Sequence, residues 1–207
     1  MDLYIRENYL KKIRGFYHAD DLIKVITGVR RSGKSSLMQM IADELKSSGI
    51  PESQIIYFDL DKREYRNVVT ADKLEALIMS KCVTDEMKYL FIDEVQNVKD
   101  FETVLNGFRT EGNWSIFITG SNSYLLSGEL VTKLTGRYIE FEIFPLNFQE
   151  YEGMKAFFGK PINSNPMIEL TNYILEGGFP RAILFDDMAD KRKYVQGVVS
   201  EIFEKDI

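Results

Sequence analysis

The sequence has few of the residues that build disulfides and zinc sites, with one cysteine and one histidine among 207 residues. A single cysteine, Cys82, excludes an internal disulfide and fits a reducing, cytoplasmic environment. Since His18 and Cys82 lie far apart in the chain, we expect no zinc site. We expect Cys82 to pack on a helix face as a small hydrophobe, because a catalytic thiol needs a histidine partner.

Long apolar runs are also missing. No segment reaches the roughly 20 apolar residues of a membrane-spanning helix, and the first seven residues mix charged with apolar side chains, unlike a signal peptide. The net charge of −6 argues against a uniformly basic surface for nucleic acid. We expect a cytoplasmic protein with no membrane partner. A local basic patch near strand ends stays open, built from Arg30, Arg31, Lys62, Arg63 and Arg66.

The most informative segment is 28–35, Gly-Val-Arg-Arg-Ser-Gly-Lys-Ser, which directly follows an apolar run. Its two glycines let the backbone turn so that successive N–H groups point at phosphate oxygens. Lys34 reaches the β- and γ-phosphates, the Ser35 hydroxyl is a Mg²⁺ ligand, and a helix starting near Lys34 adds its dipole. The alternative is an ordinary glycine-rich turn. We predict that a nucleoside triphosphate contacts Gly28, Arg30, Arg31, Ser32, Gly33, Lys34, Ser35 and Ser36.

Apolar periodicity predicts five strands separated by helices. The expected strands cover 22–27, 54–60, 89–92, 115–119 and 138–143. The expected helices cover 3–17, 34–47, 71–82 with Thr70 as N-cap, 100–110 and 123–134. Strands that alternate with helices indicate an α/β fold with a parallel, doubly wound sheet. We therefore predict a P-loop NTPase core over residues 1–146.

The pattern changes after residue 146, where only helical segments follow. They cover 147–158, 166–176, 180–189 and 190–206. We expect a helical lid over 147–207, the kind of appendage that nucleotide-driven machines carry after their last strand. Because the helical pattern runs uncapped to Ile207, we expect the lid to be truncated and the chain to be a fragment of a longer protein.

Two carboxylates directly follow the apolar run 89–92. Asp93 ends the predicted strand, where ligands gather in open α/β sheets, and we predict that it holds Mg²⁺ opposite Ser35. Glu94 is the predicted catalytic residue that orients and deprotonates the attacking water. The alternative is a pair of acidic residues that ends a strand in a solvated turn.

The end of the next strand offers three polar residues, Thr119, Ser121 and Asn122. We expect one of them beside Asp93, within reach of the γ-phosphate or the attacking water. Asn122 is the first choice and Ser121 the second, with a helix N-cap as the alternative role.

Two arginines complete the candidate residues. Arg137, just before the last strand, is placed to act as a finger toward a neighbouring subunit's γ-phosphate. Arg181, in the stretch Gly177–Arg181, is placed to report the nucleotide state from the lid. A surface ion pair is the alternative role of each arginine.

Taken in chain order, these motifs resemble those of the prokaryotic AAA-type ATPases, in particular the archaeal and bacterial subgroup related to signal-transduction ATPases. The resemblance rests on the phosphate loop and on four further stretches, Phe91-Ile92-Asp93-Glu94-Val95-Gln96, Ile118-Thr119-Gly120-Ser121-Asn122, Gly136-Arg137 and Pro145-Leu146-Asn147-Phe148-Gln149-Glu150. It implies an AAA-like core with ATP and Mg²⁺, and it places Pro180 near the adenine. It also implies a C-terminal winged-helix or nuclease-like domain, which this chain does not contain.

The expected function is Mg²⁺-dependent binding and hydrolysis of ATP, used as a switch or motor for a partner or effector domain. Two alternatives stay open: a nucleotide-gated module that binds protein or DNA with little hydrolysis, and a small-molecule kinase. GTPase chemistry is disfavoured because the sequence has no Asn-Lys-x-Asp run to read guanine. Besides ATP, the expected partners are a second copy of the chain and a protein or DNA bound through the C-terminal domain.

Overall fold

The computed structural model of the chain describes residues 3–120, 134 and 136–205. The chain folds as two compact units, each with its own internal packing. The first, called the sheet unit, comprises Glu7–Thr27 and Ser35–Glu142. The second, called the loop–lid unit, comprises Met1–Arg6, Gly28–Lys34 and Ile143–Ile207. The predicted division at residues 146 and 147 stays a prediction.

The sheet unit is built on five parallel strands in the order β2-β3-β4-β1-β5. Along the chain they are β1 (Ile23–Thr27), β2 (Ile55–Asp59), β3 (Lys88–Asp93), β4 (Trp114–Thr119) and β5 (Tyr138–Glu142). The three inner strands are buried along their whole length, as expected for a parallel sheet covered on both faces. The predicted α/β fold is confirmed, and each predicted strand lies within one residue of the observed one at both ends.

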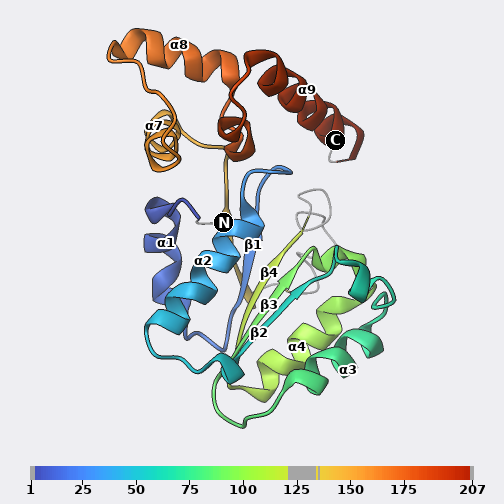
Figure 1. The fold of residues 1–207 in the computed structure, drawn as a ribbon. Coiled ribbons are helices and arrows are strands. Elements are labelled where there is room, and N and C mark those ends of the chain that lie inside the picture. Colours follow the sequence, from blue (N-terminus) through green and yellow to red (C-terminus); the bar gives the residue numbers. More distant parts are fainter. Residues whose placement is uncertain (1–2, 121–133, 135, 206–207) are drawn as a thin grey trace. The chain divides into compact units, whose positions relative to one another are not determined.

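Helices cover both faces of the sheet (Figure 1). Figure 1 shows α1 (Glu7–Ile13) and α2 (Lys34–Ser47) on one face, and α3 (Ala71–Lys81) and α4 (Phe101–Glu111) on the other. Four single-turn 3₁₀ helices join these elements: η1 (Arg14–Phe16), η2 (Glu52–Gln54), η3 (Arg63–Tyr65) and η4 (Val95–Asn97). The predicted helix 123–134 falls almost entirely outside the described residues.

Three details of these helices bear on the sequence predictions. α2 has the predicted bounds, and its apolar residues Leu37, Met38, Ile41, Ala42 and Leu45 are all buried. Cys82 packs, partly buried, against the apolar core, as expected of a small hydrophobe. The prediction for Thr70 is only half right, because Thr70 occupies the N-cap position of α3 while its side chain makes no capping hydrogen bond.

Side chains of the sheet alternate between two layers, as the strand period of two requires. One layer packs with α3 and α4 and includes Val25, Phe58, Ile92 and Ile118. The opposite face carries an aromatic row in which the ring centroids of Phe91 and Phe117 lie 4.8 Å apart. This dry packing fixes the strands, and therefore also fixes the positions of the residues at their carboxyl ends.

The loop–lid unit contains three α-helices, α7 (Phe148–Phe157), α8 (Pro166–Glu176) and α9 (Met188–Lys205), among its described residues. The prediction of a helix over 180–189 is wrong. Only a 3₁₀ helix, η5 (Pro180–Leu184), forms there, and Phe185 is extended. The reason is a new helix start, because the Asp187 carboxylate accepts hydrogen bonds from the N–H groups of Ala189 (2.7 Å) and Asp190 (3.3 Å) at the beginning of α9.

Buried charges hold the three helices of this unit together. Lys155 on α7 pairs with Glu169 on α8, and Lys191 on α9 pairs with Glu176 at 2.7 Å. Burial alone would raise the pKa of Glu169, but hydrogen bonds from Lys155 and from two neighbouring amides lower it, so that the carboxylate is ionised. None of the described helices is long and apolar enough to cross a membrane.

Candidate nucleotide site

The phosphate loop joins β1 to α2, and its backbone is bent by three residues with positive φ. They are Gly28 (139°), Arg31 (65°) and Gly33 (107°). Such a sequence of turns directs successive backbone N–H groups toward one point, which makes a concave anion site. A side chain at position 28 would collide with the Ile143 carbonyl, so only glycine fits there. The loop therefore has the backbone shape that the sequence predicts.

Lys34 lies inside this loop rather than in solvent. Its side-chain Nζ donates hydrogen bonds to the carbonyls of Gly28 (2.8 Å) and Val29 (3.3 Å), and the residue is only 7% exposed. Because Lys34 is also the first residue of α2, the positive end of the helix dipole lies beside the same cation. A buried ammonium group at a helix N-terminus is a strong anion-binding arrangement.

Two polar atoms of the loop, Arg30 Nε and Ser32 Oγ, are buried without a hydrogen-bond partner among the described residues. Buried polar groups are nearly always satisfied, so each such atom calls for an explanation. Both atoms can donate a hydrogen bond, and both belong to a segment whose backbone also presents donors. This donor set fits an anionic ligand. The hydroxyls of Ser35 and Ser36 follow in the first turn of α2.

Gly33 is the point where the loop meets two other segments of the loop–lid unit. A Cβ atom built at Gly33 would lie 3.8 Å from Arg6 Nη1 and 3.9 Å from Pro180 Cγ. The structure thus places Pro180, the predicted adenine neighbour, beside the loop, and Arg181 next to it is exposed. The Arg31 side chain donates to Glu201 of α9 at 3.2 to 3.3 Å.

In the sheet unit, Asp93 and Thr119 end the neighbouring strands β3 and β4. The Thr119 hydroxyl donates to Asp93 Oδ1 and accepts from the backbone N–H of Glu94 at 3.1 Å. Thr119, one of the three polar candidates at the end of β4, therefore lies beside Asp93. Asn122 and Ser121, which the sequence analysis preferred, lie outside the described residues.

Glu94 follows β3 in a left-handed backbone conformation, with φ 58° and ψ 48°. A non-glycine residue in this region is strained, and such strain gathers at functional sites. The carboxylate is half-buried and accepts a hydrogen bond from the Gln96 amide. Its backbone is fixed by Thr119 and its side chain by Gln96, so the carboxylate is held in one place at the carboxyl edge of the sheet.

Two residues of this edge, Asp59 and Tyr57 on β2, were missed by the sequence analysis. Asp59 pairs in register with Asp93, and the Tyr57 hydroxyl donates to the Ser35 carbonyl at 3.4 Å. Burial, reinforced by the nearby Asp93, raises the pKa of Tyr57, so that the phenol keeps its proton. Asp59 could have been predicted from the sequence, because it ends β2 just as Asp93 ends β3, and ligands gather at the carboxyl ends of such strands.

Arg137 lies at the opposite edge of the sheet. Its carbonyl accepts a hydrogen bond from the N–H of Ile23, the first residue of β1, at 2.9 Å, and its side chain is exposed. The structure therefore does not bring Arg137 together with Asp93 of the same chain. The predicted finger toward a neighbouring subunit stays a prediction.

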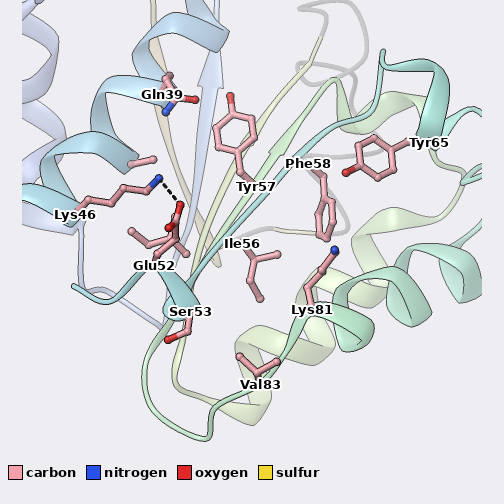
Figure 2. Close-up of a pocket in the computed structure, with 12 residues that line it drawn as sticks. Gln39, Lys46, Glu52, Ser53, Ile56, Tyr57, Phe58, Tyr65, Lys81 and Val83 are labelled. Atoms are coloured by element: carbon pink, nitrogen blue, oxygen red, sulfur yellow. Dashed lines mark hydrogen bonds and ion pairs between the residues drawn. The ribbon is translucent and has the colours of Figure 1, made fainter.

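A groove of about 420 Å³ runs beside the edge strand β2 (Figure 2). Figure 2 shows Lys46 of α2 and Glu52 at one side of the groove, joined by an ion pair of 3.2 Å, with Tyr65 and Lys81 on the other. None of the predicted nucleotide-binding residues lines it. The groove thus includes no residue of the phosphate loop, although Tyr57 of the carboxyl edge lines it (Figure 2).

Fold and loop together define a P-loop NTPase of the α/β class. The family model described as "AAA domain" matches residues 20–152, and the chain belongs to that family. An uncharacterized protein of Haemophilus influenzae is 38% identical over 206 residues, which cover 98% of this chain and 50% of the relative. The chain thus spans about half the length of this curated relative.

Solved structures give the same fold. The Saccharomyces cerevisiae Hsp104-ADP complex is similar with a TM-score of 0.61 and 16% identity, over 88% of this chain and 30% of that chain. The replication initiator DnaA bound to AMPPCP and single-stranded DNA is similar with a TM-score of 0.57 and 16% identity, over 96% of this chain and 67% of that chain. Likeness at these identities shows the fold alone, which is that of an AAA-type P-loop ATPase.

Proposed function

We propose that the chain binds ATP together with Mg²⁺ and hydrolyses it. The phosphate loop carries this proposal. Its backbone turns at three residues with positive φ, Lys34 is buried and donates to loop carbonyls, and Ser32 Oγ is a buried donor without a partner among the described residues. On binding, phosphate oxygens would replace the Gly28 and Val29 carbonyls as the acceptors of the Lys34 ammonium group.

The metal would be held by the Ser35 hydroxyl and the Asp93 carboxylate, with Asp59 as a neighbour. Among the described residues, no group of three or more histidines, cysteines or carboxylates could hold a metal ion. This fits Mg²⁺, which uses one or two carboxylates, the substrate phosphates and water rather than a protein cage. When bound, Mg²⁺ neutralises charge on the phosphates and orients them.

Glu94 is the proposed general base that orients and deprotonates the attacking water. The catalytic carboxylate must be held still, and Thr119 and Gln96 anchor the backbone and side chain of Glu94 respectively. The Thr119 hydroxyl also donates to Asp93, so a single side chain contacts both the Asp93 carboxylate and the backbone of Glu94. Arg137 and Arg181 are proposed to act as finger and sensor.

We propose that the hydrolytic cycle works as a switch or motor for a partner or for a further domain. The similar DnaA structure holds single-stranded DNA as well as AMPPCP, which keeps a nucleotide-gated DNA-binding role as a second candidate. The net charge of −6 weighs against direct DNA binding by these residues. We also propose membership of the signal-transduction-related subgroup, from the motifs given above.

Glu94→Gln tests the hydrolytic part of the proposal, because it keeps the shape of the side chain and removes the base. We expect phosphate release to fall by about a hundredfold or more, within the range of general-base contributions, while the Kd for ATP stays close to that of the wild type. Glu111→Gln makes the same change at an exposed position at the end of α4 and should leave the rate unchanged.

Two results would contradict this assignment. Unchanged phosphate release by Glu94→Gln with intact ATP binding would remove Glu94 as the base. ATP binding by the wild type without measurable phosphate release would favour the nucleotide-gated module instead. Both results come from one pair of measurements, phosphate release and equilibrium binding of ATP.

A further inference from the structure

Arg6 is a buried arginine that precedes α1 and contacts three separate parts of the loop–lid unit. Its guanidinium donates to Ser32 O of the phosphate loop (Nη1, 3.0 Å), to Phe144 O (Nη2, 3.0 Å) and to Glu150 of α7 (Nε 3.0 Å, Nη2 2.8 Å). Arg6 is 4% exposed and Glu150 is 5% exposed. The bidentate pair with Glu150 is the geometry in which a guanidinium is held most rigidly.

Glu150 has a second task at the start of α7. It is the third helical residue, its carboxylate accepts from the Asn147 N–H at 3.1 Å, and its own N–H donates to the Asn147 side chain at 2.8 Å. This is a capping box, which satisfies otherwise free N–H groups at a helix start. The same carboxylate oxygen therefore binds Arg6 and caps α7.

The contacts form an unbroken chain from the loop to the lid. Ser32 lies between the positive-φ residues Arg31 and Gly33, so its peptide group is part of the turn whose N–H groups face the predicted phosphates. A reorientation of the Ser32 carbonyl changes its hydrogen bond with the planar guanidinium of Arg6, which also donates to Phe144 O and to Glu150. Movement of the guanidinium would then shift the Glu150 carboxylate, which also forms the capping box of α7.

We propose that Arg6 is a positioning residue that transmits occupancy of the phosphate loop to α7. The inference rests on the proposed binding of ATP at that loop. Phosphate on the loop N–H groups fixes the Ser32 peptide, which fixes Arg6, which in turn strengthens the first turn of α7. A second link, Arg31 to Glu201 on α9, is exposed and contributes little, as exposed ion pairs do.

Hydrogen exchange followed by mass spectrometry tests this on the full 207-residue chain, with and without Mg²⁺ and the slowly hydrolysed analogue AMPPCP. In the wild type we expect the nucleotide to slow exchange both in the loop, 28–34, and in α7, 148–157. In Arg6→Ala we expect the loop response to persist, while the slowing in α7 falls by about fivefold or more, the low end of typical coupling between sites. For each variant, exchange with the nucleotide is compared with exchange without it, so a general loss of stability cancels.

Arg14→Ala is the matched control, since Arg14 also bridges two carboxylates, Glu7 and Glu44, but in the sheet unit and at 38% exposure. It should leave the α7 response unchanged. If Arg6→Ala does not fold, the pair Arg6→Gln with Glu150→Gln removes both charges together and leaves no buried charge unpaired. It should lose the α7 response in the same way.

The outcomes separate the inference from the proposed function. The role of Arg6 is overturned, and ATP binding is left intact, if the wild-type loop responds to the nucleotide while α7 does not. The same holds if Arg6→Ala or the double glutamine variant retains the α7 response. A wild type in which neither segment responds, and which takes up no nucleotide by calorimetry, overturns the proposed function itself.

Discussion

At the scale of single residues, Thr119 shows how one small side chain can connect two acidic residues at the carboxyl edge of the sheet. Its hydroxyl is a donor to Asp93 and an acceptor for the Glu94 N–H. The residue is fully buried, so neither hydrogen bond is shared with solvent. A change at this position therefore acts on the proposed metal ligand and the proposed base together.

Thr119→Val keeps the shape of the side chain and removes both hydrogen bonds. We expect kcat for ATP hydrolysis to fall by about ten- to a hundredfold, because hydrogen bonds to charged groups are worth roughly 1.5–3 kcal/mol. The Kd for ATP should change little, since Thr119 does not belong to the phosphate loop. Thr119→Ser, which keeps the hydroxyl, is the control and should stay near the wild-type rate. A valine variant as fast as the wild type would show that Asp93 and Glu94 do not depend on Thr119.

Positions were predictable where a local motif fixes them. The structure places Lys34 in the loop between β1 and α2 and Asp93 at the end of β3, as the motifs indicate, while their roles and that of Ser35 stay predictions. Asn122, preferred from the sequence, lies outside the described residues, so that preference also stays a prediction. Arg6 had no local signal at all, since its partner Glu150 is 144 positions away.

At the scale of elements, the sequence predicts the strands well and the lid less well. Buried strands read as unbroken apolar runs, and their observed bounds agree with the prediction to within one residue. The helix predicted over 180–189 failed because apolar spacing continues through η5, whereas the cap at Asp187 begins a separate helix. Periodicity alone does not detect such a restart.

The inner strand β1 contains a buried lysine, from which we predict a specific pH dependence of stability. Lys24 is fully buried, and its Nζ donates to Ala19 O (2.5 Å), Leu22 O (3.1 Å) and Ser115 Oγ (2.9 Å). Burial lowers its pKa to about 7, whereas a lysine in the unfolded chain has a pKa near 10.4. Between these two values the unfolded chain binds a proton that the folded chain does not.

We therefore expect the contribution of Lys24 to the free energy of unfolding to rise with pH between about 7 and about 10, by up to roughly 1.4 kcal/mol per pH unit. Outside this window its contribution is constant. Urea unfolding of the wild type and of Lys24→Met across the window measures the effect, because the methionine variant lacks the titrating group. A difference in free energy of unfolding between the two proteins that does not change with pH would contradict this prediction. It would mean that Lys24 stays charged when folded, held by its three oxygen acceptors.

At the scale of the whole molecule, the chain is an AAA-family nucleotide-binding fold with a helical segment linked to the phosphate loop. Arg6 and Arg31 both connect the loop to helices of residues 143–207, which are the contacts that the proposed transmission from loop to lid would use. The chain covers about half of its Haemophilus influenzae relative. The α/β class and the AAA family could be predicted from sequence, whereas the grouping of the loop with the lid could not, because it depends on contacts between distant segments.

Equilibrium binding of ATP and Mg²⁺ by calorimetry tests the central claim most directly, with the wild type, Lys34→Ala and Lys46→Ala compared. Lys46 lies on the same helix α2 and is exposed, so it is the matched control for the loss of a lysine. The account predicts saturable one-site binding by the wild type and by Lys46→Ala, and none by a folded Lys34→Ala. Equal binding by Lys34→Ala, or no binding by the folded wild type, would contradict it.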